Sequence, residues 1–171
     1  MIPPVFGITG WKNSGKTTLT ARLIAEFTKR GYVVSAVKHA HESFDIDQPG
    51  RDSYRLREAG AQRVVLSSPK RWALMHELRN EPEMPLNQIL AEVGDPDLVL
   101  IEGYKREPFP KIEIRRDGGT SRQPLAKSSP QIVAIASDRP SEEDDGLPTF
   151  HLDDVGGMAD FIVDYLRLPS A

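Results

Sequence analysis

The sequence predicts a single α/β domain over residues 1–171, with a mostly parallel β-sheet in a three-layer α/β/α arrangement and an added β-hairpin. Three observations support this fold class. Short β-branched runs alternate with helical stretches along the chain. The runs over residues 98–101 and 132–136 are apolar throughout, as expected of strands buried on both faces of a sheet. Two other strand-like runs are separated only by residues 68–70, which is typical of a hairpin turn.

The first 93 residues contain four predicted strands and three predicted helices. Leu19, Leu23, Ile24 and Phe27 form an apolar stripe at helical spacing on the first helix, and Gly31 follows where a C-terminal cap belongs. A proline at its first turn indicates the start of the third helix. The strands are expected over residues 5–9, 32–37, 63–67 and 71–77, and the helices over residues 16–30, 51–59 and 85–93.

The remaining residues continue the alternation and end in a helix. A stretch rich in Gly, Ser and charged residues is predicted as a mobile loop over residues 117–130, and an acidic loop is expected over residues 141–145. The last helix, over residues 156–168, should bury Met158, Phe161, Ile162, Tyr165 and Leu166, which share one helix face. The strands are expected over residues 97–102, 111–115, 132–136 and 149–152.

Composition excludes several classes of protein. Lys and Arg total 22 against 25 Asp and Glu, so the net charge is −3, and the isoelectric point is near 5.8. This balance argues against a dedicated nucleic-acid binder, which usually carries a basic surplus. The absence of cysteine excludes disulfide scaffolds, zinc fingers, iron–sulfur clusters and cysteine nucleophiles. No apolar run approaches the roughly 18 residues that a membrane span needs, so we expect a cytoplasmic protein with no membrane partner.

The first strand is followed by a motif that carries chemistry. Residues 10–17, Gly-Trp-Lys-Asn-Ser-Gly-Lys-Thr, match the phosphate-loop pattern G-x-x-x-x-G-K-[ST] at every fixed position. Its glycines let successive amides turn toward an anion, Lys16 supplies charge near the β- and γ-phosphates, and the Thr17 hydroxyl is placed to bind Mg²⁺. An ordinary Gly-rich turn is the alternative, but the position between a strand and an amphipathic helix favours the phosphate loop. The predicted nucleotide-binding residues are Gly10, Trp11, Lys12, Asn13, Ser14, Gly15, Lys16, Thr17 and Thr18.

An acidic residue at the end of a neighbouring strand usually helps to hold the metal of a nucleoside triphosphatase. Glu102 stands in that position, directly after the apolar run of residues 98–101. We therefore predict Thr17 and Glu102 as the Mg²⁺ ligands. A solvated glutamate at the exit of a strand is the alternative interpretation.

The segment after the second strand also faces the nucleotide in many α/β folds. Asp45 and Asp47 lie in this segment, where they could orient a water molecule or bind the outer shell of the metal. Together with Lys16 they are the candidate catalytic residues. His39 and His41 project from the same side of an extended chain. A pair of histidines without further ligands is a weak metal signal, and surface histidines are the more ordinary reading.

Together, three segments of the chain resemble the MobB family: residues 10–19, 38–53 and 101–105. The resemblance runs from the first strand to residue 138 and implies a P-loop NTPase fold. It further implies a dimeric GTP-binding adapter with weak GTPase activity in the biosynthesis of molybdenum cofactor, as molybdopterin guanine dinucleotide. The implied ligands are GTP and Mg²⁺. The implied partners are MobA, the guanylyltransferase that joins GMP to molybdopterin, and molybdopterin itself.

Residue types alone leave two other functions open. An ATP-dependent small-molecule kinase or ligase could use the same loop, and a kinase needs arginines over the phosphates, such as Arg115, Arg116 or Arg122. No Asn-Lys-x-Asp element of a Ras-like guanine site is present, so the residues do not identify the base. A GTPase that delivers a soft metal is disfavoured, because the chain has no cysteine and only four histidines.

The hairpin offers a surface for self-association. It carries Val64, Val65, Leu66 and Trp72, and an uncovered strand edge with apolar side chains readily pairs with another strand. We therefore predict a homodimer in which the edge of this hairpin pairs with a second copy of the chain.

Overall fold

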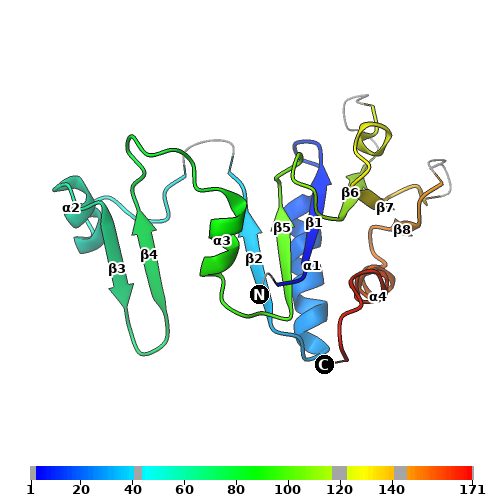
Figure 1. Ribbon diagram of the computed structural model, residues 1–171, viewed down its shortest axis with the longest axis horizontal. Helices are drawn as coiled ribbons and strands as arrows, with labels where there is room; N and C mark the ends of the chain where they lie inside the picture. The colour runs from blue at the N-terminus through cyan, green and yellow to red at the C-terminus, as the bar shows by residue number, and fades with distance from the viewer. Residues whose placement is uncertain (1–2, 41–43, 117–122, 141–145, 171) are drawn as a thin grey trace. The chain divides into compact units, whose positions relative to one another are not determined.

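Six strands form one parallel sheet in the computed structural model, which describes residues 3–40, 44–116, 123–140 and 146–170. Every pairing of neighbouring strands in this sheet is parallel, so the carboxyl ends of the strands meet at one edge (Figure 1). The predicted α/β class is confirmed. In order across the sheet the strands are β2 (Val34–Lys38), β5 (Leu98–Glu102), β1 (Val5–Gly10), β6 (Lys111–Arg115), β7 (Ile132–Ser137) and β8 (Thr149–His151).

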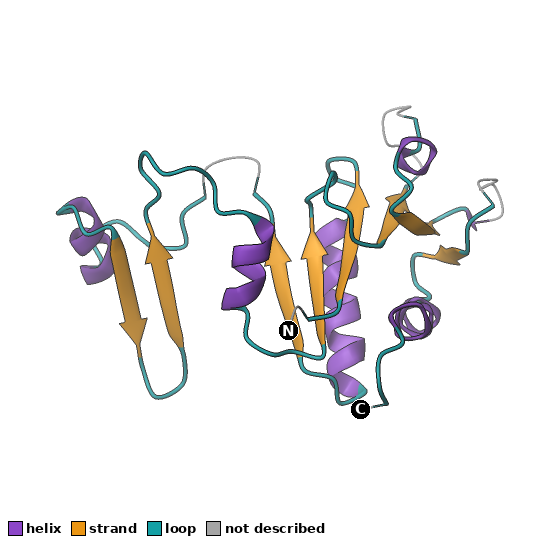
Figure 2. Ribbon diagram, in the orientation of Figure 1, coloured by secondary structure: helices purple, strands orange, loops and turns teal. Residues whose placement is uncertain are grey.

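Helices α1 (Lys16–Lys29) and α4 (Val155–Leu166) pack against each other and over one face of the sheet (Figure 2). The predicted stripe on α1 is confirmed, because Leu19, Leu23 and Phe27 are buried and Ile24 packs against them. Side chains alternate along a strand, so every second residue of β1 and β6 faces this core. No helix in the described part of the chain combines the length and apolar character that crossing a membrane requires.

Helix α4 follows its predicted pattern with one exception. Met158 and Ile162 are fully buried, whereas Tyr165 is 49% exposed, so its predicted burial is wrong. The tyrosine ring lies at the margin of the core, where it contacts the rings of Phe6 and Phe161. An aromatic ring with a hydroxyl group favours such a position, because its apolar body packs while its oxygen stays in water.

The opposite face of β6 and β7 is covered by a short 3-10 helix, η1 (Leu125–Ser128), in place of the predicted irregular loop. Its first amides are held by the carboxylate of Glu113, which accepts hydrogen bonds from Leu125 N at 2.7 Å and from Ala126 N at 3.0 Å. A buried carboxylate therefore orders this turn. Residues 117–122, also in the predicted mobile loop, and the acidic residues 141–145 lie outside the described residues.

Residues 40–89 form a second compact unit. The predicted hairpin is confirmed: β3 (Arg63–Ser67) and β4 (Trp72–His76) pair antiparallel, and α2 (Asp52–Glu58) packs against β3. Helix α3 (Leu86–Glu92) begins in this unit and ends in the first. Both helices start within one residue of their predicted positions, and the start of α3 follows the proline that predicts it.

Candidate functional site

The loop between β1 and α1 has the backbone of an anion site. Gly10, Asn13 and Gly15 have positive φ angles of 152°, 63° and 93°. A Cβ atom on Gly10 would lie 2.6 Å from Ser14 Oγ and 3.0 Å from the carbonyl oxygen of Ile114, so a side chain does not fit there. Alternating backbone conformations of this kind turn consecutive amides toward a common centre, and α1 adds the free amides of its first turn.

Lys16 folds back over this loop. Its Nζ donates hydrogen bonds to the carbonyl oxygens of Trp11 at 2.7 Å and Gly10 at 3.2 Å. Burial lowers the pKa of the Lys16 ammonium below its ordinary 10.5; the charge of Glu102 opposes the shift, and the cations Lys105 and Lys38 add to it. Three ammonium groups therefore crowd one loop, and an anion bound there relieves their mutual repulsion.

Thr17 and Glu102, the predicted Mg²⁺ ligands, meet at the start of α1. The Thr17 hydroxyl donates to Glu102 Oε1 at 3.0 Å and Oε2 at 2.9 Å. The Nζ of Lys38 lies 3.2 Å from Thr17 Oγ1 and 3.4 Å from Glu102 Oε1, so a cation already sits beside both oxygens. Hydroxyl and carboxylate oxygens are the donors that Mg²⁺ prefers, and these two residues therefore fit it. Among the described residues, no group of three or more His, Asp or Glu side chains is placed to hold a metal ion.

The other predicted loop residues divide between buried and exposed. Ser14 is buried, and its Oγ has no hydrogen-bond partner within the described part of the chain. A buried polar atom without a partner is uncommon and often marks a position that a ligand or water fills. Lys12, Asn13 and Thr18 are exposed on the outer side of the loop and of the first helical turn.

Two cations near the loop come from other strand ends. Lys105, in the segment after β5, places its Nζ 4.7 Å from the centre of the Trp11 ring. The guanidinium of Arg116 lies against Gly15, where a Cβ atom would come within 3.2 Å of its Nη2. Sequence reasoning missed Lys105, although a cation that follows an acidic strand end in a P-loop protein is a usable signal.

The arginines that a kinase could place over the phosphates differ in their contacts. Arg116 reaches the phosphate loop, whereas Arg115 forms an ion pair with Glu113 at 2.8 Å. Arg122 lies outside the described residues, as does His41. His39 stacks on the ring of Tyr104 with 4.4 Å between centroids, a packing role that needs no metal.

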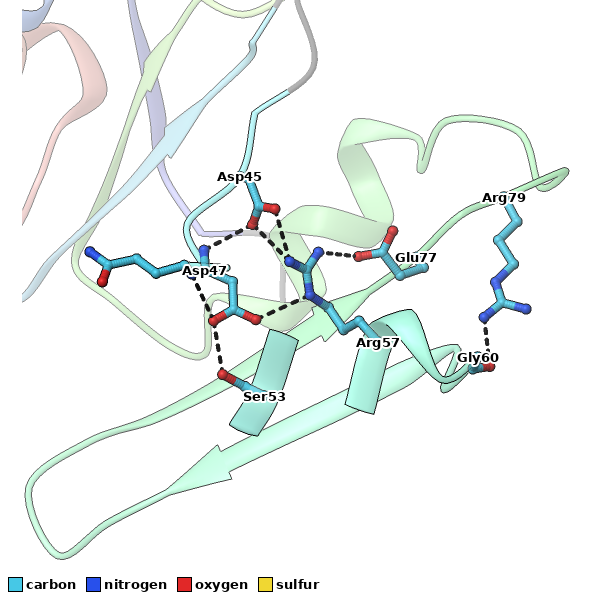
Figure 3. Close-up of polar contacts among 8 residues, drawn as sticks. Asp45, Asp47, Ser53, Arg57, Gly60, Glu77 and Arg79 are labelled. Carbon is cyan, nitrogen blue, oxygen red and sulfur yellow. Dashed lines mark hydrogen bonds and ion pairs between the residues drawn. The ribbon is translucent and has the colours of Figure 1, made fainter. Parts of the chain in front are cut away.

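Asp45 and Asp47, the predicted catalytic acids, converge on one arginine within the second unit (Figure 3). Arg57 Nη2 lies 2.8 Å from Asp45 Oδ2, and its Nε lies 3.2 Å from Asp47 Oδ2. Glu77 joins the same guanidinium at 2.7 Å, and the Ser53 hydroxyl donates to Asp47 Oδ1 at 2.8 Å. The hydrogen bonds from Arg57, with the Asp47 amide, lower the pKa of Asp45 below its ordinary 3.8. Their catalytic role stays a prediction, since this cluster is a structural feature of its own unit.

Comparison with known proteins adds to this geometry. The family model described as "Molybdopterin guanine dinucleotide synthesis protein B" matches residues 5–138. The molybdopterin-guanine dinucleotide biosynthesis adapter proteins of Escherichia coli and Haemophilus influenzae are each 40% identical to the chain over 167 residues, which is 96% of the chain and 94% and 90% of the relatives.

A solved structure agrees with the fold. The crystal structure of a MobB protein homolog from Bacillus stearothermophilus is 26% identical and superposes with a TM-score of 0.71, covering 96% of this chain and 99% of that one. The sequence match extends from β1 through the carboxyl end of β7 and so includes the phosphate loop, Glu102 and the hairpin. The chain belongs to the MobB family.

Proposed function

We propose that the chain binds GTP with Mg²⁺ at the phosphate loop, hydrolyses it slowly, and acts in the cytoplasm as an adapter in molybdopterin guanine dinucleotide biosynthesis. One observation carries the nucleotide part of the proposal. Next to a loop with positive φ angles at Gly10, Asn13 and Gly15 and a half-buried Lys16, the Thr17 hydroxyl and the Glu102 carboxylate lie within 3.0 Å of each other. A phosphate cradle and two oxygen ligands at one helix start are the parts that a Mg²⁺–nucleotide site needs.

Each residue has a distinct task in this proposal. The amides from Gly15 to Thr18 bind phosphate oxygens, and the Ser14 hydroxyl is free to join them. Lys16 leaves the carbonyl oxygens of Gly10 and Trp11 for the β- and γ-phosphates, where its charge is neutralised. Thr17 and Glu102 hold Mg²⁺, which when bound neutralises charge on those phosphates.

Slow hydrolysis fits the state of the two catalytic candidates. A carboxylate is a weaker base when hydrogen bonds lower its pKa, and Arg57 does this to Asp45. We propose that Asp45 and Asp47 contribute only weakly to hydrolysis while Arg57 holds them. A nucleotide that is hydrolysed slowly keeps the protein in its bound form for long, which suits an adapter better than a metabolic enzyme.

The adapter role rests on the relatives, which are named for it. In this proposal the chain binds MobA, the enzyme that joins GMP to molybdopterin, and can also contact molybdopterin. Its nucleotide-bound state would then determine whether the partner is held.

One observation favours the alternative, an ATP-dependent small-molecule kinase or ligase. The guanidinium of Arg116 already lies against Gly15 of the phosphate loop, where it can reach a transferred phosphoryl group. A kinase forms ADP only when an acceptor is present, whereas the proposed GTPase needs none.

Calorimetric titration with non-hydrolysable GTP and ATP analogues in the presence of Mg²⁺ separates these functions. We expect the GTP analogue to bind at least about 10-fold more tightly than the ATP analogue, a difference of about 1.4 kcal/mol. Omission of Mg²⁺ should weaken GTP binding, because the negative charge of the GTP phosphates is then repelled by the carboxylate of Glu102. A preference for ATP would overturn the guanine-nucleotide proposal and favour the kinase or ligase.

The homodimer of this proposal is supported by the exposed face of the hairpin. Val65 and Leu74 pair across the strands, and their side chains are 63% and 43% exposed; Trp72 is 68% exposed. Val64 and Met75 point to the other face and are buried. A two-stranded sheet is marginal by itself, so addition of strands from a second copy would stabilise it.

Sedimentation velocity at micromolar concentration tests this interface. The wild-type chain should sediment as a dimer, and Val65→Lys should weaken the dimer at least about 10-fold, because a lysine in an apolar contact must be desolvated. Leu56→Lys is the matched control, since Leu56 is 55% exposed in the same unit but lies on α2. A monomeric wild type, or an equal effect of both substitutions, would rule out the hairpin as the interface.

A further inference from the structure

A cavity of about 360 Å³ lies on the face of the sheet that is opposite α1. It is bounded by the segment after β5, by the start of β6 and by residues 128–132, which lead from η1 into β7. Ile112 and Ile114 face the core with α1, so the alternation of β6 turns Lys111 and Glu113 to the cavity side. Its polar lining residues include Lys105, Arg106, Lys111, Ser128, Ser129 and Gln131.

All of the charged side chains that line this cavity are cations. Lys105, Arg106 and Lys111 contribute three cations, and no carboxylate is among its lining residues in the described part of the chain. The carboxylate of Glu113, on the same strand as Lys111, is already saturated by Arg115 and by the two amides of η1. It therefore does not neutralise the cavity.

Lys111 is the most unusual member of the cavity wall, with only 1% of its surface exposed. Its Nζ donates to the carbonyl oxygens of Glu107 and Phe109 and lies 3.7 Å from the centre of the Phe109 ring. Burial lowers its pKa to about 8, against the opposing charge of Glu107, so the amine is mostly protonated at neutral pH. Both hydrogen-bond acceptors are neutral, and the ammonium has a third proton to donate. A buried cation held by neutral groups gains from an anionic ligand.

We infer that this cavity binds the phosphate group of a small phosphorylated molecule, with Lys105, Arg106 and Lys111 as its cationic ligands. The hydroxyl groups of Ser128 and Ser129 and the amide of Gln131 extend the same wall and can bind the remaining polar groups of that molecule. This site lies on the face of the sheet opposite α1, the helix that follows the phosphate loop. Lys105 also lies beside the Trp11 ring of the phosphate loop, so the two sites share this cation, and the cavity is therefore tested with binding at the phosphate loop weakened.

Titration of ¹⁵N-labelled protein with inorganic phosphate, followed by NMR, tests the site. The titration uses a Lys16→Ala background, in which binding at the phosphate loop is weakened. We expect the amide resonances of Ser128, Ser129 and Gln131 to shift in a saturable manner. Arg106→Gln should weaken the affinity about 10-fold, as expected when one charge-assisted phosphate contact is lost. Arg106 is exposed, so its replacement leaves the core intact, unlike replacement of Lys111.

Lys127→Gln is the matched control, because Lys127 is an exposed cation of η1 that does not line the cavity. It should leave the affinity unchanged. Equal weakening by Arg106→Gln and Lys127→Gln would show only general attraction of anions, and shifts confined to residues 10–18 would place all binding at the phosphate loop. Either result overturns the inference. A second titration with glycerol 3-phosphate should produce the same shifts, and failure to do so would exclude a phosphate ester as the ligand.

Discussion

Replacement of Lys16 by alanine is expected to weaken binding of a non-hydrolysable GTP analogue about 100-fold, a loss of about 2.7 kcal/mol. The ammonium lies over the phosphate loop in contact with two carbonyl oxygens, and its pKa is already lowered by burial and by two neighbouring cations. Phosphate is the partner that this charge lacks, so most of its interaction energy should appear only in the nucleotide complex. Calorimetric titration in the presence of Mg²⁺ measures the loss.

Lys29→Ala is the control for this experiment. Lys29 is an exposed lysine in the last turn of the same helix, so its removal changes the net charge equally without touching the phosphate loop. Its variant should bind the analogue as the wild type does. Retention of affinity by Lys16→Ala would mean that the nucleotide is bound elsewhere, and the proposed site would have to be abandoned.

Replacement of Gly7 by alanine is expected to lower the free energy of unfolding by about 3 kcal/mol, near the upper end for an overpacked core. Gly7 lies inside β1, where a Cβ atom would come within 2.5 Å of Phe109 Cε2 and 2.8 Å of Lys111 Cγ. The ring and the lysine stem would both have to move, and Lys111 would then lose its hydrogen bonds to two carbonyl oxygens. Urea unfolding followed by circular dichroism measures the change.

Gly156→Ala is the matched control: the same replacement of glycine by alanine is expected not to destabilise the protein. Gly156 lies in α4, and the nearest atom to its added Cβ would be Arg30 Nη2 at 3.9 Å. The change fills open space and favours the helix, so stability should stay equal or rise by about 0.5 kcal/mol. If Gly7→Ala proved as stable as Gly156→Ala, the close packing of Phe109 and Lys111 on β1 would be wrong.

The predicted elements succeed where local patterns act alone. The all-apolar run that became β5 can only be buried on both faces, and each of its residues from Leu98 to Ile101 has no exposed surface. The hairpin and the amphipathic α1 are equally local, since alternation or a helical stripe decides which face is buried. Tyr165 is the exception, because its spacing fits the stripe while its hydroxyl group favours the margin.

The candidate site shows the same division. Pattern and position predict the phosphate loop and Glu102, and the structure brings Thr17 and Glu102 into contact. The sequence offers Arg116 only as one of three arginines that could lie over the phosphates; the structure places it against Gly15, because strand order across the sheet decides which strand ends are neighbours. The pairing of Asp45 and Asp47 with Arg57 was missed, since it depends on how the segment before α2 folds over that helix.

By itself the sequence determined the class of the fold, and it predicted the phosphate loop and the acidic strand end beside it, because each depends on residue type and spacing over a few positions. Only the tertiary structure decided which side chains of the alternating segment Lys111–Arg115 are buried. Its pattern is typical of a strand with one face in water, yet β6 lies inside the sheet, and Lys111 and Glu113 are each only 1% exposed. Burial of charged groups is decided by the segments that cover them and the hydrogen bonds those segments offer, here the carbonyl oxygens before β6 and the amides of η1.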